Sequence, residues 1–156
     1  MTRRTAAFAA SIALVGVLAG IVGTAPTVGS TVLEQRVSTT RTPMYLSYSQ
    51  IGWIEPSYSG RWNIYVGYQR VGYLRQSYSN RWNIYVGYQL VGYVRPSYSN
   101  RWNVYVDYLS VGYVRQSYGS SWNAYWDFQP IGYATGFGGH LAAGVLIALY
   151  ELGYVG

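Results

Sequence analysis

The residue types best suited to binding chemistry recur at fixed positions of an alternating apolar and polar pattern. Four successive segments each carry Trp-Asn, one further residue and then Tyr, as in Trp62-Asn63-Ile64-Tyr65. A tyrosine ring can cover the apolar face of a sugar, and neighbouring amides can bond its hydroxyls. The pattern therefore predicts a glycan-binding surface formed by Asn63, Tyr65, Gln69, Asn83, Tyr85, Gln89, Asn103, Tyr105, Asn123 and Tyr125. The same tyrosines could instead be cross-strand pairs that stabilise a sheet.

Side chains that could perform catalysis are sparse. The chain has one histidine, five acidic residues and no cysteine, so it can form no disulfide and no thiolate site. Asp107 and Asp127 occupy the same phase of successive segments, and charge balance with arginine is favoured over a glycosidase carboxylate pair. His140 has no acidic residue near it in the sequence, which predicts a loop histidine rather than a ligand or base. We expect no catalytic residue, no metal site and no cofactor.

The basic and indole side chains also recur. All eleven basic residues are arginine, and the net charge is +6. From Thr31 onward nine arginines and five acids give +4, a mild basic bias suited to anionic glycans, phosphate polymers or lipid headgroups. The arginines could bind anions or contact aromatic rings, but solvated turn and edge positions are favoured. The Trp series falls on the same side of the pattern as Ile and Val, which predicts core positions for Trp62, Trp82, Trp102 and Trp122.

A tandem repeat with a period of 20 residues must position these side chains. It spans residues 42–141 as five units, of which the first and last diverge, as the end units of a stacked array usually do. Strict alternation over residues 62–69 predicts a half-buried strand, and a second strand is expected over 71–78. Ser79-Asn80-Arg81 predicts a tight turn between units. The turn within a unit, near Gln69-Arg70, lacks the usual turn residues, and the flanking glycines favour a bulge there.

Charge decides between two ways of arranging the units. In a solenoid with one unit per rung, Arg75, Arg95 and Arg115 would stack about 4.8 Å apart, which is costly. In an antiparallel meander, equivalent positions are two strands apart. The sequence therefore predicts an all-β meander of hairpins, closed into a barrel or wound into a hairpin superhelix, since a flat sheet would leave an apolar face in water.

The repeats resemble the aromatic repeats of choline-binding and glucan-binding cell-wall proteins. The shared features are the period near 20, a Gly-aromatic pair such as Gly72-Tyr73 or Gly92-Tyr93, and a Trp-rich strand downstream. The resemblance implies hairpin units wound into a superhelix with ligands between units. The family's Trp-Tyr-Tyr run is missing here, and the basic charge does not suit a choline cation.

The two ends of the chain differ from the repeats. Residues 1–30 have a short Arg3-Arg4 segment followed by a long apolar run, which predicts an export signal or, alternatively, a retained anchor. Residues 31–41 are expected to form a linker. Residues 142–156 are nearly all apolar at first, which predicts a buried helix or strand that plugs or caps one end of the sheet, with Gly153 ending a helix.

Three functional hypotheses follow from the sequence. The first is an exported, non-enzymatic protein of a bacterial envelope or surface that binds a cell-wall or extracellular glycan, with no nucleic-acid partner. The second is a small envelope membrane β-barrel with the Trp, Ile, Val and Tyr face toward lipid and the Asn, Tyr and Gln face toward a lumen. The third is a self-associating, fibre-forming surface protein, because Tyr-rich strands with little charge can stack into cross-β structure.

Overall fold

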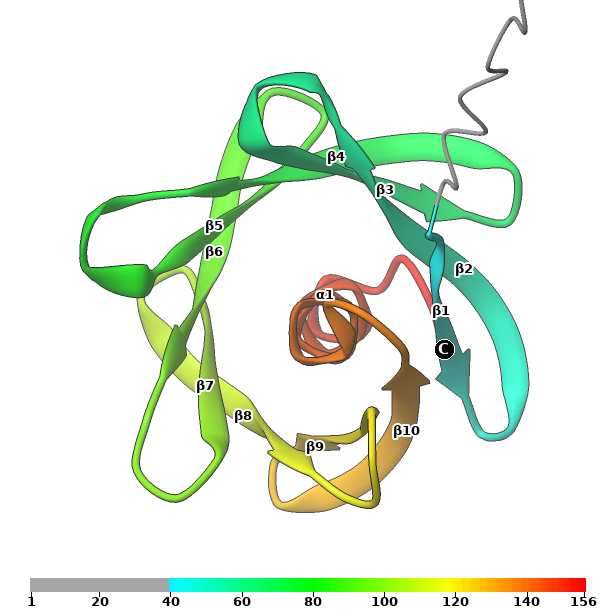
Figure 1. Ribbon diagram of the computed structural model, residues 1–156, viewed down its shortest axis with the longest axis vertical. Helices are drawn as coiled ribbons and strands as arrows, with labels where there is room; N and C mark the ends of the chain where they lie inside the picture. The colour runs from blue at the N-terminus through cyan, green and yellow to red at the C-terminus, as the bar shows by residue number, and fades with distance from the viewer. Residues whose placement is uncertain (1–39) are drawn as a thin grey trace, which may run out of the picture. The chain divides into compact units, whose positions relative to one another are not determined.

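Residues 40–156, which the computed structural model describes, form a closed ten-stranded β-barrel that contains one α-helix (Figure 1). The strands are β1 (Thr42–Leu46), β2 (Ser49–Ser57), β3 (Arg61–Val66), β4 (Gln69–Gln76), β5 (Trp82–Val86), β6 (Gln89–Pro96), β7 (Arg101–Val106), β8 (Leu109–Gln116), β9 (Ser121–Trp126) and β10 (Gln129–Thr135), and the helix is α1 (Gly139–Glu151). The predicted export signal and all but the last two residues of the predicted linker lie outside the described residues.

Every strand pairs antiparallel with the next one, and β1 pairs with β10, where Tyr45 lies opposite Tyr133. The predicted antiparallel meander is therefore confirmed. Of the two arrangements that the sequence left open, the chain forms the barrel, and the superhelix implied by the resemblance is not formed. Closure pairs both edges of the sheet, so the barrel has no free strand edge.

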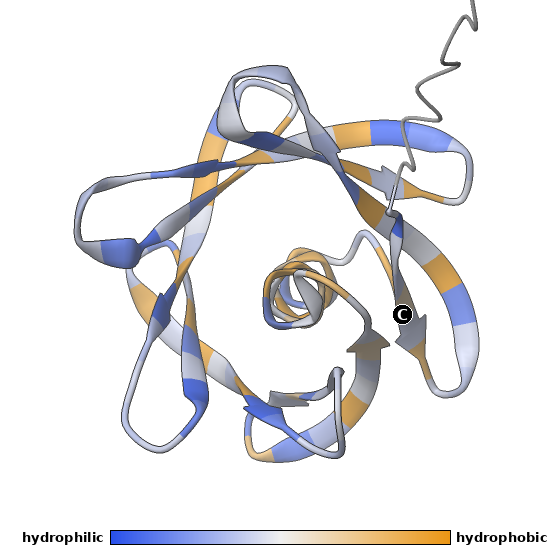
Figure 2. Ribbon diagram, in the orientation of Figure 1, coloured by the Kyte–Doolittle hydropathy of each residue, from blue (hydrophilic) through white to orange (hydrophobic). Residues whose placement is uncertain are grey.

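Hydrophobic and hydrophilic residues alternate along the strands (Figure 2), and the apolar side chains of this alternation form the buried core. Ile64 is fully buried in the interior, whereas Tyr65, the next residue, packs on the outer surface against Trp53. The inner layer at mid-height consists of Met44, Ile54, Ile64, Leu74, Ile84, Val94, Val104, Val114, Ala124 and Ala134, all 0% exposed. Trp62 is buried and the other three tryptophans of the series pack against the same core, which confirms their predicted positions.

Within each hairpin the turn lies two residues earlier than the sequence predicted. β3 ends at Val66, and the two-residue turn is Gly67-Tyr68. Only Gly67 of this pair has positive φ (58°), as in a type II′ turn, which suits the twist of a hairpin. The strand predicted over residues 62–69 was therefore too long, since Tyr68 lies in the turn with its side chain 95% exposed. Gln69 and Gln89 are likewise not on the first strand of their hairpins but begin β4 and β6.

The predicted bulge is present in every hairpin, and it links neighbouring hairpins. The β3–β4 register shifts between Ile64 and Tyr65, which leaves Val71 as the extra residue. The carbonyl of Val71 accepts a hydrogen bond from the backbone N–H of Gly87, in the next turn, at 2.7 Å. The same bond recurs around the barrel and closes it from Ser47 N to the carbonyl of Ile131 at 3.2 Å. Each turn is thus fastened to the preceding hairpin.

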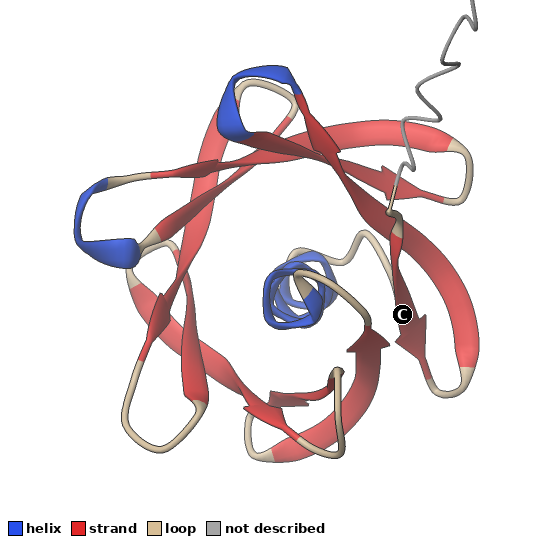
Figure 3. Ribbon diagram, in the orientation of Figure 1, coloured by secondary structure: helices blue, strands red, loops and turns tan. Residues whose placement is uncertain are grey.

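The connections between hairpins follow the sequence prediction. Ser79 and Asn80 have φ of 63° and 58°, and the backbone N–H of Ser77 bonds the carbonyl of Arg81 at 2.7 Å. Two of these connections are short 3-10 turns, Tyr58–Gly60 and Tyr78–Asn80 (Figure 3). Serine, asparagine and glycine tolerate this left-handed backbone because their side chains are small or bond locally.

The apolar C-terminal segment is a helix, and it lies inside the barrel rather than over one end of the sheet. Residues 141–149 of α1 are all buried, and the helix is apolar on every side. It begins at Gly139, within the range predicted for the last repeat. It ends as predicted at Gly153, which has φ of 72°, and Tyr154 N bonds the carbonyl of Leu149 at 2.9 Å. Among residues 40–156 no helix is long and apolar enough to cross a membrane.

The interior is shaped to hold α1 away from the centre. The helix contacts β7 to β10 and β1 more than the other strands. Along the chain the inward side chain shrinks in step with this, from Ile64 and Ile84 to Val104 and Ala124 on the first strands of successive hairpins. The second strands show the same trend from Leu74 to Ala134. Small side chains therefore line β7 to β10 on the side that α1 occupies, whereas β1 carries the larger Met44.

Candidate binding surface

Five stacked aromatic pairs form a belt around the outer surface at mid-height. We call these pairs the aromatic belt: Tyr45–Tyr133, Trp53–Tyr65, Tyr73–Tyr85, Tyr93–Tyr105 and Tyr113–Tyr125. Their ring centroids are 4.6–5.0 Å apart and the ring planes differ by 10–14°. Each predicted site tyrosine is therefore stacked against a ring of the neighbouring hairpin. One face of each ring is therefore occupied by a cross-strand partner, as the alternative role in stabilising the sheet requires.

Guanidinium groups extend these pairs into layered stacks. Arg81 lies 4.8 Å from the centroid of Tyr93, and Arg95 lies 4.9 Å from the centroid of Tyr105, whose hydroxyl accepts a hydrogen bond from it at 2.9 Å. Arg41, Arg61 and Arg101 lie over belt rings in the same way, at 4.0–5.0 Å. The arginines that the sequence placed in solvated turns are thus held against aromatic faces, an arrangement worth about 0.5–1 kcal/mol each at exposed sites.

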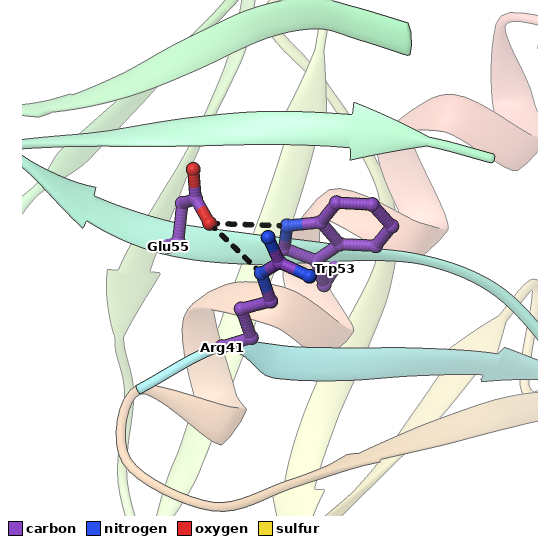
Figure 4. Close-up of polar contacts among 3 residues, drawn as sticks. All are labelled: Arg41, Trp53 and Glu55. Atoms are coloured by element: carbon purple, nitrogen blue, oxygen red, sulfur yellow. Dashed lines mark hydrogen bonds and ion pairs between the residues drawn. The ribbon is translucent and has the colours of Figure 1, made fainter. Parts of the chain in front are cut away.

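The first stack contains an acidic residue where the other hairpins have arginine or threonine. Glu55 accepts hydrogen bonds from Arg41 Nε at 3.1 Å and from the indole N–H of Trp53 at 3.3 Å (Figure 4). This is the one ion pair among residues 40–156. Burial, and then the hydrogen bond and negative charge of Glu55, raise the pKa of Tyr65. Arg41, the last residue of the predicted linker, is therefore fixed to the barrel.

The most exposed aromatic side chains were not part of the predicted site. We call them the tip aromatics, because they lie in the connections at both ends of the barrel: Tyr48, Tyr58, Tyr68, Tyr78, Tyr88, Tyr98, Tyr108, Tyr118 and Phe128. Their side chains are 75–96% exposed. Their spacing of ten residues was the signal in the sequence, but the strands predicted over residues 62–69 and 71–78 included both Tyr68 and Tyr78, which lie in turns.

Three of the nine tip positions have a backbone that is costly for an aromatic residue. Tyr48, Tyr108 and Phe128 have φ of 70°, 67° and 63°, a region that favours glycine or asparagine. Adopting this backbone costs a residue with a side chain about 1–2 kcal/mol. These rings give the barrel little packing in return, since at least three quarters of each is exposed. The hairpin turn needs this backbone but not an aromatic side chain, and a residue poorly suited to its backbone is typical of a functional position.

The two ends of the barrel carry opposite charge. The arginine end, at the connections between hairpins, holds Arg41, Arg61, Arg75, Arg81, Arg95, Arg101 and Arg115 with the single acid Glu55. The acidic end, at the turns within hairpins, holds Asp107, Asp127, Glu151 and Arg70. Helix α1 runs from the first end to the second, since His140 packs on Trp102 and Glu151 bonds Trp126. Its dipole adds to the same polarity.

Open grooves on the outer surface separate neighbouring hairpins at the arginine end. One, of about 840 Å³, lies between Tyr78 and Tyr98 and is lined by Arg81, Arg95 and Asn103. A second, of about 520 Å³, is lined by Asn83 and Tyr85 together with Arg75 and Tyr78. The structure thus brings three predicted site residues into grooves at this end.

The other predicted site residues are placed differently. Gln69 and Gln89 lie at the acidic end, away from the Asn and Tyr residues with which they were grouped. Asn63 lies opposite Glu55 in the sheet, and Asn123 lies opposite Arg115 on one side and Tyr133 on the other. Tyr65, Tyr105 and Tyr125 are half-buried in the belt. The predicted site residues therefore share the outer surface of the barrel but do not form one continuous site.

His140 is not a loop residue, as the sequence predicted, but lies in the first turn of α1. Its ring is 4.2 Å from the centroid of Trp102 and 5.3 Å from that of Trp122. Burial lowers the pKa of His140 from 6.5 to about 4, and the positive end of the helix acts in the same direction. No group of three or more His, Cys, Asp or Glu side chains within residues 40–156 could hold a metal ion.

Protonation of His140 is expected to destabilise the barrel. Because the pKa is lower in the folded state, the unfolded chain takes up the proton first. The contribution of neutral His140 to the free energy of unfolding is therefore fully present above pH 6.5. It is lost as the pH is lowered toward 4, a decrease of about 2 kcal/mol. His140→Gln removes this part of the pH dependence. Urea unfolding at pH 7 and pH 4.5 measures the difference, and equal losses in both proteins would contradict it.

Comparison with known proteins finds no family model, curated protein or solved structure that matches this chain. The class of the protein therefore rests on its own geometry. Its described part, residues 40–156, is an all-β antiparallel meander of ten strands, closed into a barrel, with an aromatic outer surface and one short C-terminal helix.

Proposed function

We propose that this chain is an exported, non-enzymatic protein of a bacterial envelope or surface that binds a glycan or another wall polymer. Contact is made by the tip aromatics together with the edges of the aromatic belt and the polar groups beside them. The observation that carries this proposal is the exposure of the tip aromatics, which recur every ten residues and are 75–96% accessible.

Exposed rings next to amides and hydroxyls suit sugars. The ring offers an apolar face for the C–H groups of a pyranose, and the polar groups bond its hydroxyls. At the arginine end, Tyr78 and Tyr98 form opposite sides of a groove that also contains Ser77, Ser97 and Asn103. Apolar rings and hydroxyl or amide groups thus converge on one space.

Repetition compensates for weak single contacts. A polymer that reaches several hairpins binds the second and third contacts at high effective concentration, so avidity can exceed single-site affinity by about 10²–10⁴. The hairpins surround the barrel, and their connections present one tip aromatic after another. This arrangement suits a long or surface-bound ligand better than a free monosaccharide.

The two alternatives receive less support. The Ile, Val and Trp face that a membrane barrel would turn toward lipid is packed against α1. The fibre-forming alternative needs open strand edges, and the pairing of β1 with β10 leaves none.

Substituting a belt tyrosine is expected to lower the free energy of unfolding, whereas substituting a tip tyrosine should leave it nearly unchanged. Tyr88→Ala should leave the free energy of unfolding within about 0.5 kcal/mol of wild type, because the ring is 96% exposed. Tyr85→Ala should lower it by about 1–2 kcal/mol, because the ring stacks on Tyr73 at 4.6 Å. Urea unfolding measures both changes.

Binding tests the proposal itself. A triple variant of Tyr58, Tyr78 and Tyr98 to Ala, and a second of Tyr68, Tyr88 and Tyr108, are incubated with insoluble wall polysaccharide. We expect at least one triple variant to lose tenfold or more of its retention while remaining folded. Leu109→Ala is the matched control, since Leu109 is exposed and apolar and lies next to a tip aromatic but has no aromatic ring itself. Wild-type protein that is not retained, or full retention of both triple variants, overturns the proposal.

A further inference from the structure

We infer that the arginine end is an oxyanion-binding site and that the polymer it takes is an anionic polysaccharide, with carboxylate or phosphate groups on its sugar units. The main groove of this site is the one of about 840 Å³ between Tyr78 and Tyr98, with Arg81 and Arg95 beside them. This inference rests on the proposed function and adds to it the charge of the ligand and the end of the barrel that binds it.

Apart from Arg41, the arginines at this end form no ion pair with a carboxylate of residues 40–156. Within residues 40–156 the one ion pair joins Arg41 to Glu55, and the remaining acids are at the opposite end. Arginine pairs also face each other directly across the sheet, with Arg61 opposite Arg75 and Arg101 opposite Arg115. Like charges directly opposite one another are unfavourable. The fold therefore maintains a concentration of positive charge that a bound anion would relieve.

Stacking holds the guanidinium groups in place. Arg81 lies over Tyr93, and Arg95 lies over Tyr105 and donates to its hydroxyl at 2.9 Å. Fixed planar guanidinium groups bind carboxylate and phosphate in a two-pronged geometry that lysine cannot reproduce, and less side-chain entropy is lost on binding. The absence of lysine from the whole chain is consistent with a requirement for this geometry.

The groove has room for sugar as well as charge. Its volume of about 840 Å³ lies within the roughly 300–1,000 Å³ of ligand pockets. Ser77, Ser79 and Ser97 add aliphatic hydroxyl groups to those of the two tyrosines, and no acidic side chain lines the groove. A bare inorganic anion would leave the exposed tyrosines unused. A sugar ring that bears an oxyanion uses the rings, the hydroxyls and the guanidinium groups together.

The opposite charge of the acidic end gives the binding a direction. Asp107 and Asp127 lie in turns beside Tyr108 and Phe128 and would repel an anionic chain. The tip aromatics of the arginine end should therefore contribute more to binding than those of the acidic end. Low salt should strengthen the interaction, since exposed charges are screened within about 10 Å at 0.1 M.

The test is calorimetric titration of the folded chain with four soluble polymers. Polygalacturonate supplies carboxylates, phosphomannan supplies phosphates, dextran is neutral, and single-stranded oligothymidylate is a nucleic acid. We expect at least one anionic polysaccharide to bind tenfold or more tightly than dextran, and the two anionic probes distinguish carboxylate from phosphate. Oligothymidylate that binds as tightly, with the same response to substitution, would assign the site to nucleic acid and overturn the inference.

Single substitutions separate a built site from general attraction. Arg95→Gln and Arg81→Gln should each weaken anionic binding about five- to tenfold, and Arg95→Lys should weaken it nearly as much because charge alone is insufficient. Arg70→Gln is the matched control: it removes one exposed arginine from the other end and should change binding less than twofold. Equal losses for Arg70→Gln and Arg95→Gln, or full binding by Arg95→Lys, would overturn the inference.

Failure of this inference is distinguishable from failure of the proposed function. Retention on neutral polysaccharide that depends on the tip aromatics, without any effect of Arg81 or Arg95, would leave the proposed function standing and reject the anionic site. Loss of binding to every polysaccharide by folded protein would reject both. Thermal unfolding of each variant confirms that it is folded, and Arg95→Gln, at an exposed position, provides the test if Arg81→Gln does not fold.

Discussion

Removing α1 by ending the chain after Gly138 is expected to abolish folding of the barrel. The helix buries Leu141, Val145, Leu146, Ile147 and Leu149, each at most 2% exposed. Burying one such side chain contributes about 1.5–3 kcal/mol, and the total stability of a domain is about 5–15 kcal/mol. The side chains of α1 therefore account for as much free energy as the whole fold has available.

The empty barrel could not recover this loss by collapsing. Its inner layer is smallest where α1 lies, with Ala124 and Ala134 on β9 and β10. Those strands cannot reach the opposite wall while the hydrogen bonds of the closed sheet persist. Circular dichroism and urea unfolding should show no cooperative transition in the truncated chain.

A shorter truncation is the control for the loss of chain length. Ending the chain after Leu152 removes only residues 153–156 and leaves every buried residue of α1 in place. We expect it to fold, with a modest loss from the bond between Tyr154 N and the carbonyl of Leu149. A cooperative β-sheet transition in the chain that ends at Gly138 would show that the helix is not required.

Gly72→Ala is expected to lower the free energy of unfolding by about 3–5 kcal/mol, the range of severe core substitutions. A Cβ at Gly72 would lie 1.9 Å from the carbonyl oxygen of Tyr85, on the neighbouring strand. That oxygen belongs to the backbone, so the strand itself must move. The same contact recurs at Gly52, Gly92, Gly112 and Gly132, at 1.9–2.2 Å. The glycine of each Gly-aromatic pair is therefore required by the close approach of two strands beside the bulge.

Gly87→Ala separates this contact from the general cost of replacing glycine. Gly87 lies in a turn at φ of 59°, and a Cβ there would meet nothing within 4 Å. We expect a loss of about 1 kcal/mol from backbone strain alone. Urea unfolding of the two variants gives the comparison, and equal losses would show that strand approach is not the reason for glycine at position 72.

The sequence by itself determined the outline of the barrel wall. The alternation of Trp62, Ile64 and Val66 with Asn63 and Tyr65 assigns each residue to the inner or outer face, because side chains of a strand point alternately to its two sides. Glycine on both sides of the turn predicted a bulge, and Ser79-Asn80 predicted a left-handed connection. These features depend on neighbours in the chain and can therefore be read without tertiary structure.

The charge argument for a meander was right in its conclusion and incomplete in its reasoning. A meander separates Arg75 from Arg95, as expected. It also places Arg61 directly opposite Arg75, because the two strands of a hairpin pair residues from different positions of the 20-residue pattern. Strand register depends on the turn, and the turn was predicted two residues late. The arginine end could not be inferred without the correct turn.

Only the tertiary structure decided that the meander closes and what fills it. Closure depends on β1 and β10, which are about ninety residues apart in the sequence and meet only when every strand between them twists in step. The apolar run after Gly138 is compatible with a cap or a plug, because a buried segment is apolar in either place. Its place inside the barrel follows from the decrease from Ile64 to Ala124 along the inner layer, which creates room only after the wall has closed. The tip aromatics were visible as a ten-residue spacing, but their exposure at the two ends depends on where each turn falls in three dimensions.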